Sequence, residues 1–174
     1  MDALLAPASP VTNALLATLS DEAAVLERLA ACADRQLEAL RLGAVDRFET
    51  AGTETAEAVS ALDQTGKVRL RQHGLLARTL GLDEGLPLAD LAARLSEAEA
   101  AQLNEARERV RTAAAAADAR CDALAFSLHY AVELGRETLT AWRDLGSARP
   151  AHVYTAAGAT SSAGAGRPLL NQTG

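Results

Sequence analysis

The fold is decided by residues 96–145, SEAEAAQLNEARERVRTAAAAADARCDALAFSLHYAVELGRETLTAWRDL. The stretch opens on a capping box, because Ser96 is followed three residues later by Glu99. It contains no proline and a single glycine, Gly135. A helix over its whole length is about 75 Å long at 1.5 Å per residue. Such a helix needs a long partner helix or a binding partner to cover its apolar face.

Small and apolar residues in this stretch recur at alternating spacings of four and three, which is a heptad seam. The seam consists of Val110, Ala114, Ala117, Cys121, Leu124, Leu128, Ala131, Gly135, Thr138, Trp142 and Leu145. It is narrow and lined by alanine near Ala117, and it becomes broad and strongly apolar toward Trp142. Close helix packing is therefore expected in the first half of the seam and a larger apolar surface in the second.

The rest of the chain supplies two more long helices and a connector. Residues 10–42 carry leucines and alanines at heptad spacing, between Pro10 and a stop at Gly43. A second helix is expected over 46–80, with Asp46 as N-cap and a stop at Gly81. Gly52 and Gly66 within it allow either close backbone approach or a kink. A short connector helix is expected over 88–95, and the long helix over 96–145. The sequence thus predicts an all-α fold, an elongated antiparallel bundle of three long helices with coiled-coil-like packing over residues 1–146.

The segment 147–174 is expected to be a mobile tail, because it is rich in glycine, alanine and serine and has few large side chains to bury.

The composition of the chain also limits the classes of partner that it can bind. The net charge of −6 opposes binding to nucleic acid and to anionic membranes. No apolar run reaches the roughly 20 residues of a membrane span, and the first residues do not resemble a signal peptide. A cytoplasmic protein is expected.

No constellation of catalytic or metal-binding residues is evident. The histidines His73, His129 and His152 are scattered, and no HExxH, CxxC or Glu-x-x-His motif occurs. Cys32 and Cys121 fall at seam positions, where a buried free thiol acts as a small apolar side chain. We therefore expect no catalytic site, no cofactor and no metal. An enzyme built within a helical bundle is disfavoured on this ground.

The order of these features resembles the FlgN family, the flagellar type III export chaperones for hook-associated proteins. Four stretches carry the resemblance, namely Leu40-Arg41-Leu42-Gly43-Ala44-Val45-Asp46-Arg47-Phe48, Leu62 to Leu82 with its closing Leu-Gly-Leu, Leu86-Pro87-Leu88-Ala89-Asp90-Leu91, and Pro150 to Gly158 with its Tyr-x-x-x-Gly element. The resemblance covers nearly the whole chain.

The resemblance implies a protein-binding function without chemistry. Members of the family keep hook-filament junction proteins (FlgK/FlgL type) unassembled in the cytoplasm and deliver them to the export gate protein FlhA. The C-terminal part of the family chain binds cargo, and a tail tyrosine docks to FlhA; by motif that residue is Tyr154. The candidate cargo-binding residues are Leu128, Val132, Leu139, Trp142 and Leu145.

Two other readings of the long helices stay open. The first is a structural coiled-coil scaffold or adaptor without an export role, which would form large assemblies. The second is weak self-association of the chaperone itself. The apolar residues Leu124 and Leu128 also fit plain bundle core, whereas Leu139, Trp142 and Leu145 lie where the first helix offers little cover.

Overall fold

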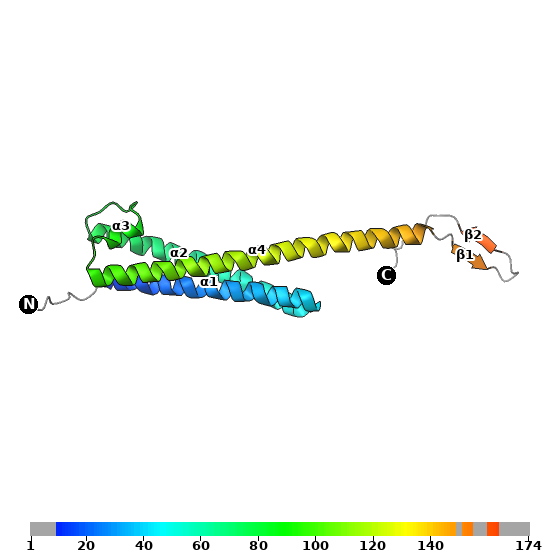
Figure 1. Cartoon of the computed structure of the whole chain (residues 1–174), viewed down its shortest axis with the longest axis horizontal. Helices are drawn as coiled ribbons and strands as arrows, with labels where there is room; N and C mark the ends of the chain where they lie inside the picture. The colour runs from blue at the N-terminus through cyan, green and yellow to red at the C-terminus, as the bar shows by residue number, and fades with distance from the viewer. Residues whose placement is uncertain (1–9, 149–150, 155–159, 164–174) are drawn as a thin grey trace, which may run out of the picture. The chain divides into compact units, whose positions relative to one another are not determined.

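In the computed structural model, four helices carry the fold (Figure 1). The structure describes residues 10–148, 151–154 and 160–163, with side chains described over 10–146. The helices are α1 (Pro10–Leu42), α2 (Val45–Thr79), α3 (Leu88–Ala92) and α4 (Glu97–Ala148). The predicted all-α bundle is confirmed. The chain divides into two compact units, Met1–Ser127 and Leu128–Gly174, which are described separately below.

Glycines end the first two helices as the sequence predicts. Gly43 and Gly81 are the two residues with a positive φ, at 64° and 68°, within the described chain. Each forms a Schellman motif. After α1, Gly43 N–H donates to Leu40 O at 3.2 Å and Ala44 N–H to Ala39 O at 2.9 Å. After α2, Gly81 N–H donates to Arg78 O at 3.0 Å, and Leu82 N–H donates back into the last turn. Both chain reversals are therefore set by local sequence.

The capping box of the long helix is also confirmed. Glu99 N–H donates to Ser96 Oγ at 3.4 Å, and Ser96 N–H donates to Glu99 Oε2 at 3.3 Å. The helix α4 then runs through Gly135 without interruption. The predicted Asp46 cap is wrong: α2 begins at Val45, and Ala44 precedes it without a side-chain cap. The backbone turn at Gly43 already directs the chain into α2, and Asp46 instead lies in the first turn, where a carboxylate suits the helix dipole.

The connector helix is shorter than predicted, because α3 ends at Ala92 rather than Leu95. Arg94 and Leu95 form tight turns back to Leu91 and Ala92 before Ser96 starts the next helix. Leu91 and Ala92 are buried in one cluster with Leu15, Leu19, Leu76, Ala77 and Leu103. The connector thus closes one end of the bundle, at the left in Figure 1. The leucines of the cluster at this end come from all four helices.

Farther along the bundle, alanines form most of the buried contacts between α1 and α4. A second cluster joins Ala23 and Leu26 of α1 to Ala113 and Ala117 of α4, with Leu62 of α2 packed beside them. The alanine-lined part of the predicted seam is therefore core.

Polar pairs fix the register of the helices. Thr18 Oγ1 donates to Gln72 Oε1 at 2.6 Å, and Thr55 Oγ1 donates to Gln36 Oε1 at 3.1 Å. The ion pairs Glu22–Arg69 and Arg35–Glu54 join the same two helices. As the residue number rises along α1 from Thr18 to Gln36, the number of the partner on α2 falls from Gln72 to Thr55, so these helices are antiparallel. From the ion pair Glu27–Arg109 to the ion pair Asp34–Arg120, the residue number rises along both α1 and α4. These two helices are therefore parallel.

The Glu22–Arg69 pair lies within the bundle. Glu22 is 7 % exposed, and its Oε2 lies 2.8 Å from Arg69 Nε. Neither atom has a hydrogen-bond partner in the part of the chain that the structure describes, so their mutual attraction is what compensates for their burial. The Arg69 side chain is 39 % exposed, so it is loss of Arg69 that would leave an uncompensated, largely buried carboxylate at Glu22. This requirement ties α1 and α2 to one register.

Two short strands, β1 (Ala151–Tyr154) and β2 (Thr160–Ala163), form an antiparallel hairpin in the second unit. Ala151 pairs with Ala163 and Tyr154 with Thr160. The sequence did not predict this pairing, because only Val153 and Tyr154 favour a strand within a segment of small residues. That the segment 147–174 is a mobile tail stays a prediction.

Gly66 is the clearest place to stabilise the bundle. It lies inside the unbroken helix α2, and a Cβ built on it meets no atom within 4 Å. Gly66 therefore neither permits a close approach nor ends the helix, whereas a Cβ on Gly52 would lie 3.4 Å from Gln36 Nε2. Because glycine costs a helix interior about 1 kcal/mol relative to alanine, Gly66→Ala should raise the free energy of unfolding by about 0.5–1 kcal/mol in urea titrations.

Gly74→Ala is the comparison variant for this prediction. Its Cβ would lie 2.9 Å from Glu84 Oε2, so the new methyl group must displace a carboxylate that pairs with Arg78. A smaller gain, or a loss, is expected there. A destabilising Gly66→Ala would show that the middle of α2 is not helical in solution.

Candidate functional site

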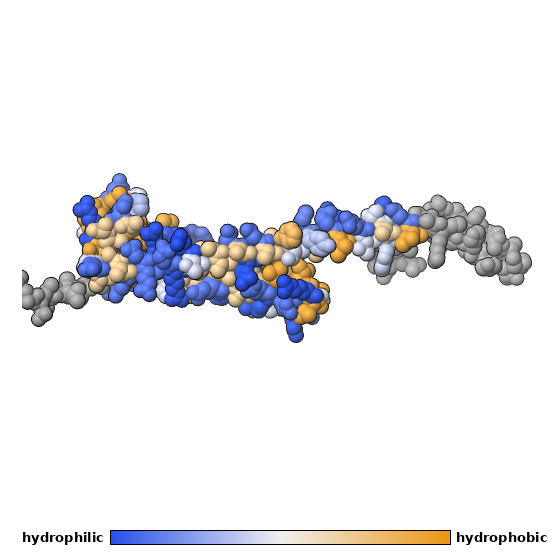
Figure 2. Space-filling view, in the orientation of Figure 1, coloured by the Kyte–Doolittle hydropathy of each residue, from blue (hydrophilic) through white to orange (hydrophobic). Residues whose placement is uncertain are grey.

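The candidate site is the apolar surface of α4 within the second unit. Among its exposed large side chains are Val132, Leu139, Trp142 and Leu145, of which Trp142 is 70 % and Leu139 is 69 % exposed. Leu128 is half-buried. Four of the five predicted cargo-binding residues are thus open to solvent, and Leu128 is only partly so. Figure 2 shows apolar side chains in orange along this part of α4.

The surface is wider than the predicted residues alone. Tyr130 and Leu134 are also exposed, at 63 % and 51 %. Successive residues turn by roughly 100° around a helix. On that geometry Leu128, Val132 and Leu139 lie together, with Trp142 and Leu145 beside them and Leu134 and Tyr130 beyond. The apolar arc therefore covers more than half of the helix circumference.

Tyr130 and Leu134 were missed because they lie outside the heptad seam. The signal that identifies them is a second row at spacings of four, which begins at Phe126, a residue of the first unit that is also exposed. Such a row lies along one line of a helix surface. Apolar residues at spacings of four outside the heptad seam are therefore the sequence signal for this part of the surface.

Charged side chains occupy the rest of the circumference. Glu133 and Arg136 form an ion pair at 3.0 Å, and Arg143 Nε lies 3.4 Å from Asp144 Oδ1. His129 and Thr140 are exposed on the same side. The helix surface is thus divided into a broad apolar arc and a narrower polar arc, an arrangement suited to docking against the apolar face of a partner helix.

Tyr154, the predicted gate-docking residue, lies in β1 and pairs through its backbone with Thr160 of β2. Its side chain lies outside the described side chains. Tyr154 therefore belongs to a different element from the apolar arc of α4. The role of Tyr154 stays a prediction.

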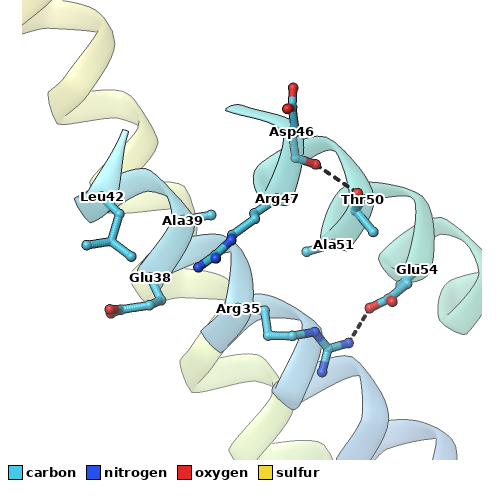
Figure 3. Close-up of a pocket in the computed structure, with 9 residues that line it drawn as sticks. All are labelled: Arg35, Glu38, Ala39, Leu42, Asp46, Arg47, Thr50, Ala51 and Glu54. Carbon is cyan, nitrogen blue, oxygen red and sulfur yellow. Dashed lines mark hydrogen bonds and ion pairs between the residues drawn. The ribbon is translucent and has the colours of Figure 1, made fainter. Parts of the chain in front are cut away.

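One hollow of about 380 Å³ lies where α1 ends and α2 begins. Its wall mixes charges of both signs, as Figure 3 shows, with the Arg35–Glu54 ion pair on one side and the Arg47 side chain pointing toward α1. The other lining residues are Glu38, Ala39, Leu42, Asp46, Thr50 and Ala51. The one hydroxyl among its lining residues, that of Thr50, donates a hydrogen bond to the backbone oxygen of Asp46 at 2.8 Å.

The two cysteines behave as structural thiols. Cys32 is fully buried and accepts a hydrogen bond from Arg35 Nη2 at 3.1 Å. Partial burial raises the pKa of the Cys121 thiol above its ordinary value, and the carboxylates of Asp118 and Asp122 act in the same direction. A raised pKa keeps this thiol protonated and weakly nucleophilic. Among the described residues, no group of histidine, cysteine or carboxylate side chains is placed to hold a metal ion.

The fold and this surface define a helical bundle that presents an apolar face for binding another protein. The sequence model of the family described as "FlgN protein" matches residues 10–162. The chain therefore belongs to the FlgN family, the flagellar export chaperones, and has a general role in flagellum assembly. No curated protein and no solved structure matches the chain. Within the described residues, no helix combines the length and apolar character that a membrane crossing requires.

Proposed function

We propose that this chaperone acts in the cytoplasm, where it binds hook-associated proteins of the FlgK/FlgL type, prevents their premature assembly, and delivers them to the export gate protein FlhA. The observation that carries the cargo assignment is the exposure of Trp142, Leu139 and Leu145 on a helix already divided into apolar and polar arcs. Large apolar side chains gathered on one exposed face are typical of a protein-interaction site.

The expected free energy of cargo binding fits a chaperone that binds its cargo reversibly. Cargo subunits polymerise through terminal coiled-coil segments, whose apolar faces the α4 surface can cover. Burial of about 500 Å² of apolar area would contribute about 12 kcal/mol at 25 cal/mol per Å². Lost translational and rotational freedom and side-chain ordering remove much of that gain. The remainder suits a complex that is firm in the cytoplasm and is released at the gate.

The proposed mechanism uses no catalysis. Binding and release need only burial and re-exposure of the α4 surface, without ATP, metal or covalent chemistry. The protein is therefore proposed to be a non-enzyme that uses no cofactor.

The deciding experiment for the cargo is capture of flagellar axial proteins from the source organism on the purified full-length chain. We expect selective retention of hook-filament junction proteins, and we expect this retention to be lost when their terminal segments are removed.

The second candidate function is a coiled-coil scaffold, which the length of α4 favours. Capture of none of the axial proteins, together with open-ended assemblies in size-exclusion light scattering, would support the scaffold instead.

For the gate, Tyr154→Ala should lower export of hook-associated proteins severalfold while leaving cargo affinity and thermal unfolding unchanged. The reason is that Tyr154 lies in β1 rather than on the apolar arc of α4. Secretion assays in cells with matched expression measure the effect. Tyr154→Phe separates the ring from the hydroxyl group, and His152→Ala tests a neighbour in the same strand. Export at the unaltered rate in Tyr154→Ala would remove Tyr154 from gate docking.

A further inference from the structure

Two rows of large apolar side chains run along α4 in the second unit. One is the heptad seam, which includes Leu128, Leu139 and Trp142. The other is the row at spacings of four, called here the row of four, which includes Tyr130, Leu134 and Trp142. Tyr130 is 63 % and Leu134 is 51 % exposed, and Trp142, which belongs to both rows, is 70 % exposed. The surface therefore offers two lines along which a partner helix can lie.

The two rows diverge from Trp142 toward the start of the second unit. Residues four apart turn by roughly 40° around a helix, so the row of four winds away from the seam, which keeps to one side. At Tyr130 the row of four lies roughly opposite Leu128 on the helix circumference. The apolar stripe that a packed helix buries is typically about 100° wide. One partner helix therefore cannot cover both rows over their whole length.

The row of four replaces a charged flank that α4 has in the first unit. About seven turns before each of Tyr130 and Leu134, the same side of α4 carries a charged residue; these residues are Glu105 and Arg109. Arg109 pairs with Glu27 of α1, so this flank forms a polar rim of the bundle contact. Packing of α4 in the first unit thus uses an apolar stripe with a charged flank, whereas the second unit is apolar in both places.

The charged neighbours of the two rows have opposite signs. In the row of four, an apolar residue is followed three residues later by a glutamate; the pairs are Tyr130 with Glu133 and Leu134 with Glu137. In the seam, an apolar residue is followed four residues later by an arginine; the pairs are Val132 with Arg136 and Leu139 with Arg143. Residues at these spacings are neighbours on a helix surface. The row of four therefore has an acidic edge and the seam a basic edge.

Building on the cargo role proposed for α4, we propose that one cargo molecule binds this surface with two different helical segments. The first segment lies along the seam and carries carboxylates on the edge that faces Arg136 and Arg143. The second lies along the row of four and carries lysine or arginine on the edge that faces Glu137. The two segments come together at Trp142, which contacts both of them.

The width and the charges of the surface select this occupant. A single long helix, whether from cargo or from a second copy of this chain, would leave either Tyr130 and Leu134 or the seam exposed. Exposed apolar side chains gathered in this way are typical of a surface that a partner covers. Because the two edges differ in sign, two identical segments would not match both rows. A cargo with one acidic-edged and one basic-edged helix matches both.

Site-specific photo-cross-linking of the full chain in complex with a captured hook-associated protein tests the proposal. A benzoylphenylalanine residue in place of Leu134 should cross-link to a cargo segment rich in lysine and arginine. The same residue in place of Leu139 should cross-link to a different cargo segment, one that carries carboxylates. Thr140 lies on the polar arc, so a benzoylphenylalanine there is the matched control and should give little cross-linked product.

A charge reversal tests the predicted edge contact. Glu137 is exposed and forms no ion pair in the part of the chain that the structure describes, so its carboxylate is available to cargo. Glu137→Arg should raise the dissociation constant for cargo about tenfold in calorimetric titrations. Glu105→Arg makes the same change in net charge at an exposed site in the first unit, and it should leave the dissociation constant unchanged.

The possible failures are distinguishable from one another. Cross-links from positions 134 and 139 to the same cargo segment would overturn the two-segment arrangement and leave the proposed function intact. A cross-link from position 134 to β1 or β2 would also overturn it, because the row of four would then be covered by the chain itself. An unchanged dissociation constant in Glu137→Arg would overturn the basic edge of the second segment. If no axial protein formed a complex, the proposed function would fail together with this arrangement.

Discussion

Leu103→Ala should lower the free energy of unfolding by roughly 3 kcal/mol, the largest loss of stability we expect from a single truncation. Leu103 is 1 % exposed and belongs to α4, yet its cluster joins Leu15 and Leu19 of α1, Leu76 of α2 and Leu91 of α3. Truncation removes buried methyl groups from the one place where all four helices meet. The leucines around it come from three other helices, so the cavity cannot collapse by a shift of one of them.

Urea denaturation followed by circular dichroism measures this loss, and Leu134→Ala is the matched control. Leu134 lies on the same helix but is half-exposed, so its truncation should change the unfolding free energy by less than about 0.5 kcal/mol. Equal losses at the two positions would mean that α4 is not packed against the leucine cluster as described.

Both ends of α1, the stop after α2 and the start of α4 could be predicted because each is set by a few neighbouring residues. Gly43 and Gly81 supply the positive φ that a Schellman turn needs, and Ser96 with Glu99 closes the first turn of α4. These are interactions within six residues of chain. No knowledge of the fold is required to recognise them, and α1 begins and ends at the predicted residues.

The division of the long seam between core and surface could not be predicted in the same way. The apolar pattern continues from Val110 to Leu145, but Ala113 and Ala117 are buried while Leu139 and Trp142 are exposed. Heptad periodicity shows that one face of a helix is apolar, but it does not show which other helix or partner covers that face. The answer depends on where α1 stops: Asp34 pairs with Arg120, and α1 ends at Leu42, about two turns later.

The buried polar pairs were missed for a related reason. Glu22 and Arg69 are far apart in sequence, and each looks like an ordinary charged residue on its own helix. They become an ion pair only once the turn at Gly43 fixes how α1 and α2 align. The signal for such a pair is that several polar residues of α1 and α2 face one another in a single antiparallel alignment. Thr18 with Gln72 and Gln36 with Thr55 pair in the same alignment.

If hook-associated proteins bind the α4 surface as proposed, Trp142→Ala should raise the dissociation constant for such a cargo about ten- to hundredfold, with the free energy of unfolding unchanged within about 0.5 kcal/mol. Trp142 is the largest side chain on the apolar arc and is 70 % exposed, so it contributes little to the fold of the free protein. On cargo binding it would lose that exposure, and large aromatic anchors of this kind dominate interface energies. Calorimetric titration with a cargo segment, paired with urea denaturation, measures both quantities.

Thr140→Ala is the matched control, because Thr140 lies on the polar arc of the same helix and should affect neither quantity. The two measurements separate two physical roles. A side chain that acts only on a partner changes affinity alone, whereas a core side chain changes stability by several kcal/mol. If Trp142→Ala destabilised the free chain by that amount, its indole would be buried in solution and the α4 surface would not be the cargo site. If neither quantity changed, the cargo would dock elsewhere on the α4 arc, with Tyr130 and Leu134 as the next residues to truncate.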